Sequence, residues 1–286
     1  YEQYIGMHFQ SVNFLPYLEQ GGRDTWTRND IILTQGATLN PLPGLNVRAE
    51  FSANYTYRDL QQVRSRVDVI ENQDLNALVI GNGFSATDYI NNQANNNQYY
   101  VLNTYADYTI DRDNTHYFKV MVGFNQEWGK NQFIRSRAFG LITPAVTDLN
   151  ATTGSQETYG GKSDVSLRGA FYRVNYIFKE RYLLEANGRY DGTSRFPTDD
   201  RFGFFPSASA AWRVDRESFF KADWINQFKI RASYGSLGNQ SVGEYGYIPS
   251  LVAATGNYII DGKLPQRIIA PPLVSANYGW EDVSTL

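Results

Sequence analysis

The chain has 286 residues, of which 42% are hydrophobic, 15% are aromatic and none is cysteine, and its formal net charge is -3. Without cysteine it has no disulfide, thiol nucleophile or cysteine-based zinc site. The slightly acidic balance, with no cluster of basic residues, argues against a nucleic-acid-binding protein. We find no apolar run of about 18 residues, so a membrane-spanning helix is not expected, whereas spanning β-strands are compatible with this composition.

In chain order, the first two expected strands occupy residues 25–39 and 45–57. In the second, every odd position from Leu45 to Tyr57 is apolar or aromatic, whereas the even positions carry Arg48, Glu50 and uncharged polar residues. Successive side chains of a strand point to opposite faces, so this pattern predicts one apolar and one polar face. The first strand is less regular, because Gln35 falls among its apolar positions.

The same alternation recurs in six further segments, near residues 100–110, 118–127, 170–178, 182–190, 204–214 and 228–234. About eight such strands in succession predict a sheet that curls around a polar interior or has one face in water. The periodicity alone does not say which face meets lipid.

The connections between these strands alternate between short and long. Short turns are expected at residues 40–44, 111–114 and 179–181, a helical turn within 215–225, and long loops near 60–98, 129–164, 191–201 and 236–279. An up-and-down membrane barrel has this asymmetry, with short periplasmic turns and long external loops, whereas a soluble sandwich has no reason for it. The fold class we expect is therefore all-β, an antiparallel up-and-down transmembrane β-barrel.

In such a barrel, charged residues of the polar faces would line the lumen, where they solvate it and brace the wall. The candidates are Arg48, Glu50, Lys119, Glu127, Arg173, Glu185, Arg189, Arg213, Lys229 and Arg231. Aromatic residues near strand ends would form interfacial girdles, although tyrosine and tryptophan are also common in ordinary β-structure. They are Tyr55, Tyr57, Tyr99, Tyr100, Trp128, Tyr176, Phe178, Tyr182, Tyr190, Trp212 and Tyr234. The Asn/Gln-rich residues 90–98 are expected at a loop tip.

Catalytic chemistry finds little support in the sequence. The only histidines, His8 and His116, are too far apart for a metal-ligand spacing. Residues 191–201 hold three aspartates and two arginines, and a glycosidase does need a pair of carboxylates. The alternative that we favour is an Asp-Gly turn at residues 191–192 with ion pairs that order the loop. We therefore expect no enzyme activity, no metal and no cofactor.

Several motifs in the second half of the chain follow one another in a characteristic order. They are Asp191-Gly192-Thr193-Ser194-Arg195-Phe196, Phe205-Pro206-Ser207 leading into Ala210-Ala211-Trp212-Arg213, Arg231-Ala232-Ser233-Tyr234-Gly235 with Gly238-Asn239-Gln240, and Asn277-Tyr278-Gly279-Trp280-Glu281. They resemble barrel signatures of the SusC/RagA family of TonB-dependent outer-membrane transporters. The likeness is strongest over residues 168–239. Before residue 99 only the general character of the sequence is similar, without matching motifs.

This resemblance implies a barrel of about 22 strands around an N-terminal plug. Residues 1–286 would then be part of the barrel domain, a fragment without plug, TonB box or leader. The resemblance also implies active import of glycans, or less readily peptides, across the outer membrane. A SusD-like surface lipoprotein and the TonB complex would be partners, the latter through parts outside this chain. The signature loop would comprise Asp191, Gly192, Ser194, Arg195 and Phe196.

Two other classes of protein stay open at this point. Eight strands can close a small stand-alone outer-membrane barrel that acts as a passive pore or an adhesin. A secreted carbohydrate-binding β-sandwich is the other alternative. The substrate-binding residues are unknown, but four aromatic residues in the expected loops are suited to stack on sugar rings: Phe84, Tyr89, Phe139 and Tyr247.

Overall fold

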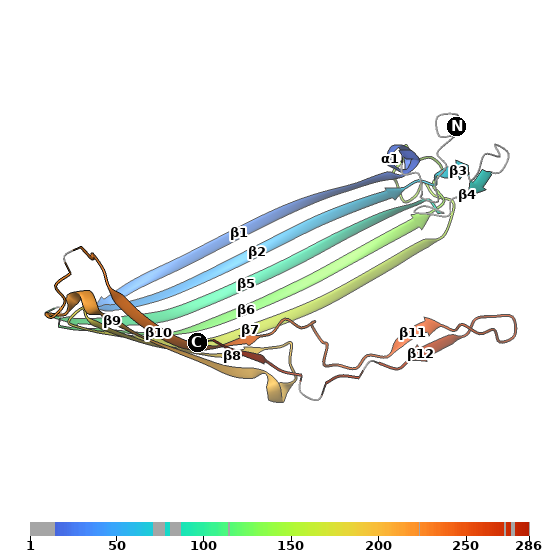
Figure 1. The fold of residues 1–286 in the computed structure, drawn as a ribbon. Helices are drawn as coiled ribbons and strands as arrows, with labels where there is room; N and C mark the ends of the chain where they lie inside the picture. The colour runs from blue at the N-terminus through green and yellow to red at the C-terminus, as the bar shows by residue number, and fades with distance from the viewer. Residues whose placement is uncertain are drawn as a thin grey trace. The chain divides into compact units, whose positions relative to one another are not determined.

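The computed structural model describes residues 15–70, 78–80, 87–113, 115–222, 224–271, 273–275 and 278–285. Nine strands form one sheet in the order β1-β2-β5-β6-β7-β8-β9-β10-β13 (Figure 1). Their bounds are β1 Gly22–Leu42, β2 Leu45–Arg64, β5 Tyr89–Arg112, β6 His116–Phe139, β7 Gln156–Phe178, β8 Tyr182–Thr193, β9 Phe202–Arg213, β10 Lys229–Asn239 and β13 Glu281–Thr285. The strands pair in chain order and antiparallel, so the all-β fold class is confirmed.

Strands β1 and β13 stand at the two ends of this order, so the sheet is open in the part of the chain that the structure describes. Smaller elements lie in the connections: helix α1 Leu15–Gln20, the ladder of β3 Asp68–Ile70 with β4 Leu78–Ile80, the ladder of β11 Val252–Thr255 with β12 Gln266–Ile269, and the short 3-10 helices η2 Thr198–Asp200 and η3 Val214–Arg216. No helix among the described residues has the length and apolar content needed to cross a membrane.

The described residues form two compact units. The first holds residues up to Ile32 together with those in Asn54–Gln98 and Lys130–Ser163. The second holds Leu33–Ala53, Tyr99–Gly129 and the chain from Asp164 onward. Strands β1, β2, β5, β6 and β7 contribute residues to both units, whereas β8, β9, β10 and β13 belong to the second.

The short turns lie where the sequence predicts them. Gly44 closes the first hairpin at a φ of 82°, a left-handed conformation that glycine adopts without a steric cost. Lys179 and Glu180 both have positive φ, at 50° and 54°, as a two-residue type I′ hairpin turn requires. The β9–β10 connection begins with η3, in agreement with the helical turn expected there.

The predicted loops were too long, because the strands continue into them. Residues 90–98, expected at a loop tip, lie within β5. Their amides pair across strands instead of facing water: Asn91 Nδ2 donates to Gln62 Oε1 at 2.8 Å, and Gln93 Oε1 accepts from Arg135. Likewise β6 and β7 take up much of residues 129–164. The main connections on this side are therefore residues 65–88, 140–155, 194–201 and 240–280.

Each unit has a small buried cluster of its own. In the first, Val63, Ile90 and Ala138 are buried, and Leu141 and Leu149 of the β6–β7 connection pack against them. This connection therefore covers an apolar part of β2, β5 and β6.

In the second unit, Phe196 is fully buried among aromatic rings. Its centroid lies 5.4 Å from that of Trp280, which in turn lies 5.1 Å from that of Phe205. Trp280 also donates from Nε1 to the backbone oxygen of Arg201 at 2.9 Å. The β8–β9 connection and the approach to β13 thus share one core.

Candidate functional site

Strand register in the second unit separates two faces of the sheet. One cross-strand row consists of Val174, Ala186, Ala208 and Tyr234. The neighbouring row consists of Asn175, Glu185, Ser209 and Ser233. Because residues directly opposite one another in a sheet share a face, the first row belongs to an apolar face and the second to a polar face.

The apolar face is open to its surroundings in this unit. Large side chains on it are about half exposed: Leu184 52%, Tyr190 51%, Phe204 53%, Ile230 51% and Tyr234 50%. On β2, β5 and β6, Phe51, Tyr100 and Trp128 form a group of neighbouring rings, with the centroids of Tyr100 and Trp128 5.3 Å apart. An apolar surface of this kind needs a partner that is itself apolar.

The polar face carries a network of charges on β2, β5 and β6. Asp107 is buried, and its carboxylate accepts from Asn46 Nδ2 at 2.9 Å and lies 3.2 Å from Lys119 Nζ. Arg48 donates to the hydroxyl of Tyr105 at 3.5 Å. A buried carboxylate needs such partners, and these contacts link β2, β5 and β6.

The network continues along β7, β8 and β9. Arg173 Nε donates to Asn187 Oδ1 at 2.7 Å, and the amide of Asn187 donates to Glu185 at 2.8 Å. Arg189 makes a bidentate pair with Asp191, with both distances at 2.9 Å. That carboxylate lies against Gly169, where the Cβ of any other residue would be 1.9 Å from Asp191 Oδ1. Any other residue at position 169 would displace this carboxylate from its bidentate pair with Arg189.

The other predicted charged residues have fewer contacts. Arg213 pairs with Asp215 at 2.7 Å, and Lys229 lies opposite Arg213 in the register of β9 with β10. The side chains of Lys229, Arg231 and Glu50 are exposed, and the structure gives none of them an ion pair within the described chain. All ten predicted residues lie on strands of the second unit. That their face lines a lumen stays a prediction.

Two tyrosines on the polar face differ from the sequence-based expectation. Tyr99 was expected in an aromatic girdle, but its hydroxyl donates to Glu127 on the polar face. Tyr105, beside Arg48, was not predicted at all. Tyr99, Tyr105 and Asp107 are all odd-numbered residues of β5, so their side chains lie on the same face. This alternation was the sequence signal that could have placed both tyrosines on the polar face.

The signature loop is held by contacts with neighbouring segments of the second unit. The predicted Asp-Gly turn is wrong, because Asp191 and Gly192 are both paired residues of β8. The ion pairs expected within the loop are wrong as well: Arg195 reaches Glu244 at 3.5 Å, and Arg201 Nε donates to the backbone oxygen of Phe196. The preceding Ser194 fixes the loop through its Oγ, which accepts from the backbone N–H of Ser166 at 2.9 Å.

His116, at the start of β6, lies beside two aromatic residues of β7. His116 Nδ1 lies 2.9 Å from the hydroxyl of Tyr176, and its ring is near that of Phe178. Within the described ranges, no group of acidic and histidine side chains is arranged to hold a metal ion. The predicted residues His8 and Phe84 lie outside the described residues.

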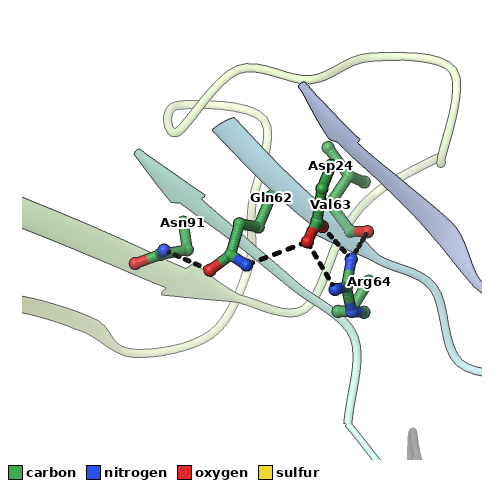
Figure 2. A network of polar contacts seen from close by, with 5 residues as sticks. All are labelled: Asp24, Gln62, Val63, Arg64 and Asn91. Carbon is green, nitrogen blue, oxygen red and sulfur yellow. Dashed lines mark hydrogen bonds and ion pairs between the residues drawn. The ribbon is translucent and has the colours of Figure 1, made fainter. Parts of the chain in front are cut away.

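A polar chain joins three strands of the first unit (Figure 2). The guanidinium of Arg64 pairs with Asp24, which also accepts from Gln62 Nε2 at 3.1 Å, and Asn91 donates in turn to Gln62. The pair is partly exposed, so we expect about 1 kcal/mol or less from it, and its main effect is to hold β1, β2 and β5 in register.

A carboxylate in the β9–β10 connection gives a pH-dependent prediction. Glu217 accepts from the hydroxyl of Tyr182 at 2.7 Å and from Trp212 Nε1 at 3.0 Å, and it pairs with Arg181 at 3.0 Å. These contacts lower the pKa of Glu217, with the hydrogen bond from Tyr182 as the largest cause. The stabilisation is therefore complete above the unfolded-state pKa of about 4.3 and is lost as the pH falls through the lower folded-state pKa.

We expect the full-length protein to lose thermal stability below about pH 4.5 more steeply than its Glu217→Gln variant. Thermal melting in detergent across this range measures the difference. Glu180→Gln is the matched control, because Glu180 is exposed and pairs with a residue, Arg216, that is exposed as well. Parallel stability curves for wild type and Glu217→Gln would contradict the assignment.

An open antiparallel sheet with one exposed apolar face and one ion-paired face has the features of part of a β-barrel wall. A family model described as "TonB dependent receptor-like, beta-barrel" matches residues 2–272, and the chain belongs to this family. The predicted membership of a SusC/RagA-like transporter family is thereby confirmed.

Individual relatives agree with this assignment. TonB-dependent receptor P26 of Formosa agariphila is 30% identical over 265 residues, which cover 91% of this chain and 25% of that protein. TonB-dependent receptor SusC of Bacteroides thetaiotaomicron is 28% identical over 179 residues, which cover 59% of this chain and 17% of that protein. The chain thus spans about a quarter or less of the length of these relatives.

Solved structures show the same fold. The RagAB peptide transporter superposes with a TM-score of 0.74 at 18% sequence identity, over 94% of this chain and 28% of that one. The closed-closed state of the RagAB peptide importer gives a TM-score of 0.76 at 17% identity, with the same coverage.

Proposed function

We propose that this chain is part of the barrel wall of an outer-membrane transporter that actively imports glycans. The observation that carries the proposal is the pair of unlike faces in the second unit. The apolar face would meet the hydrocarbon of the membrane, because half-exposed leucine, isoleucine and phenylalanine side chains are stable there. The face that carries Asp107, Lys119 and Arg189 would line a water-filled lumen.

Strand lengths are compatible with this arrangement. A strand tilted by about 45° needs about 9–11 residues to cross the hydrocarbon. Strands β8 and β9 have 12 residues each, which suffices for one crossing. Strands β1, β2, β5, β6 and β7 have 20 to 24 residues, so each would extend past the hydrocarbon toward the long connections. The long connections would then lie outside the cell.

The two alternative classes have less support. A stand-alone eight-stranded barrel would pair its first strand with its last, whereas β1 and β13 end the order of the described sheet. A soluble carbohydrate-binding sandwich would bury its apolar rows against a second sheet. In the second unit these rows are exposed, which favours the membrane barrel.

Family membership supports a proposal for the energy source and the partners. A TonB complex would supply energy through parts of the protein outside this chain, and a SusD-like lipoprotein would cover the external side. We favour glycans over peptides because the first unit carries a pair of partly exposed aromatic rings, Tyr89 and Phe139. Such rings pack against the apolar faces of sugar rings.

Deletion of the gene for the full-length protein tests this function. We expect the deletion strain to lose growth on one polysaccharide while keeping growth on its monosaccharides, and the intact gene to restore it. Loss of TonB should reproduce the defect, because active import needs that energy. Unchanged growth on every polysaccharide, together with lost growth on peptides, would replace glycans by peptides as the substrate.

A further inference from the structure

Two arginines of β6 in the first unit are held by uncharged neighbours. Arg135 and Arg137 are two positions apart on one strand and therefore point to the same face. Arg135 donates from Nε and Nη2 to Gln93 Oε1, at 2.8 and 2.5 Å. The guanidinium of Arg137 lies over the ring of Tyr89, 4.7 Å from its centroid. These contacts orient both side chains without neutralising them.

Several arginines of the chain pair with a carboxylate, whereas these two neighbours on one strand face do not. Arg64, Arg189 and Arg213 each pair with an aspartate. Over the ranges that the structure describes, neither Arg135 nor Arg137 has an acidic oxygen within ion-pair distance. Arg137 Nε is in addition buried without a hydrogen-bond partner there. Two guanidiniums on the same face of one strand repel each other, so an anion bound to both would relieve an unfavourable interaction.

One carboxylate of β7 in the same unit already has a hydrogen-bond partner. The carboxylate of Glu157 accepts a hydrogen bond from the hydroxyl of Tyr159 at 2.6 Å. Within the described residues, Glu157 is therefore engaged with Tyr159 and forms no ion pair with either arginine.

An aromatic pair adjoins the two arginines. The rings of Tyr89 and Phe139 meet edge to face with centroids 6.1 Å apart, and Tyr89 is the ring that Arg137 covers. Both aromatic side chains are only partly buried. Aromatic rings pack on the C–H faces of a sugar, and paired guanidiniums bind a carboxylate or a sulfate.

We propose that Arg135, Arg137, Tyr89 and Phe139 form a subsite for an acidic glycan. The two guanidiniums bind its carboxylate or sulfate group, and the aromatic pair packs against the sugar ring that carries this group. This subsite rests on the proposed glycan import and gives it a substrate class. An acidic peptide would use the arginines but has no rigid ring that bears its charge, so the adjoining aromatic pair favours the glycan.

Binding to the full-length protein in detergent, measured by calorimetry, tests the subsite. The probes are a galacturonic acid hexamer, a sulfated carrageenan hexamer, neutral cellohexaose and hexaglutamate. We expect one or both acidic sugars to bind, and Arg135→Gln with Arg137→Gln to weaken that binding by about tenfold or more. Arg135→Lys with Arg137→Lys, which keeps the charge, should give an intermediate loss.

Arg58→Gln is the matched control for the loss of a positive charge. Arg58 lies over the ring of Trp26 at 5.3 Å, on strands β2 and β1, and has no ion pair in the described chain. This variant should bind the acidic sugars within about twofold of wild type, because its arginine is outside the subsite. An equal loss in Arg58→Gln would mean that only the overall charge matters, and would overturn the subsite.

The remaining outcomes separate the subsite from the proposed function. Equal binding of cellohexaose to wild type and to the double glutamine variant, with no preference for acidic sugars, overturns the subsite and leaves glycan import standing. Binding of hexaglutamate alone overturns both. Failure of every acidic probe to bind at millimolar concentration overturns the subsite as well. A heat-resistant folded band on electrophoresis confirms that each variant is assembled.

Discussion

Arginine in place of Ala210 is expected to prevent most of the protein from assembling in the membrane, whereas arginine at the adjacent Ser209 is expected to be tolerated. Ala210 lies opposite Leu184 and Ala232, within the apolar face. An arginine near the middle of the lipid-facing surface of a barrel costs about 2–4 kcal/mol. At position 209 the same side chain would face Glu185 and the polar side of the sheet, where it meets water and a carboxylate.

Both variants introduce arginine at adjacent positions of β9, so the charge, size and strand propensity of the introduced residue are the same. The fraction of heat-resistant folded protein in isolated outer membranes measures the outcome. We expect a reduction of at least about tenfold for Ala210→Arg and of less than about twofold for Ser209→Arg. The reverse order would mean that the alanine-rich face looks into the water-filled passage, and the proposed transport function would then lose its basis.

The sequence contains enough information to predict these two faces. Alternation depends only on the pleat of a strand, which every residue of the strand obeys. The parity of Leu45, Ala210 and Tyr234 therefore gave the correct face without any knowledge of their neighbours. The short turns were equally predictable, because Pro43-Gly44 restricts the backbone locally.

Features that depend on partners far along the chain were not predictable. Residues 90–98 have the composition of a loop, and only the cross-strand amide pairs of Asn91 and Gln93 make them a strand. Asp191-Gly192 has the composition of a turn, but Arg189 and the empty space above Gly169 accommodate the aspartate within β8. Neither arrangement can be inferred from one segment alone, because each needs the register of its neighbour.

The proposed subsite shows the same limit. Tyr89 and Phe139 were predicted as sugar-stacking candidates by residue type, and the structure brings these two together at 6.1 Å. Arg135 and Arg137 were not predicted, since an arginine without a carboxylate partner cannot be recognised until its surroundings are known. Tyr247, the third aromatic candidate in the described chain, lies in the second unit near Tyr278.

Removal of the Phe196 side chain is expected to open the connection between β10 and β13. Phe196 is fully buried, and its ring meets those of Trp280 and Tyr278 at 5.4 and 6.0 Å. Truncation of a buried phenylalanine to alanine costs about 3–5 kcal/mol through lost contacts and the cavity that remains. We expect the loss of stability to be confined to the connection between β10 and β13, because Trp280 anchors the end of this connection just before β13.

Hydrogen exchange of the full-length protein in detergent checks this prediction. Backbone amides of residues 194–201 and 240–280 should exchange about a hundredfold faster in Phe196→Ala, while those of β8 and β9 should change little. Phe219→Ala removes the same atoms from a side chain that is 63% exposed, so it should leave exchange near wild type. Uniform acceleration over the whole sheet would show instead that Phe196 supports the barrel wall itself. An unchanged pattern would show that the signature loop is held by the hydrogen bonds of its Ser194 and Arg195 side chains to the backbone of Ser166 and Val242, without need of the aromatic core.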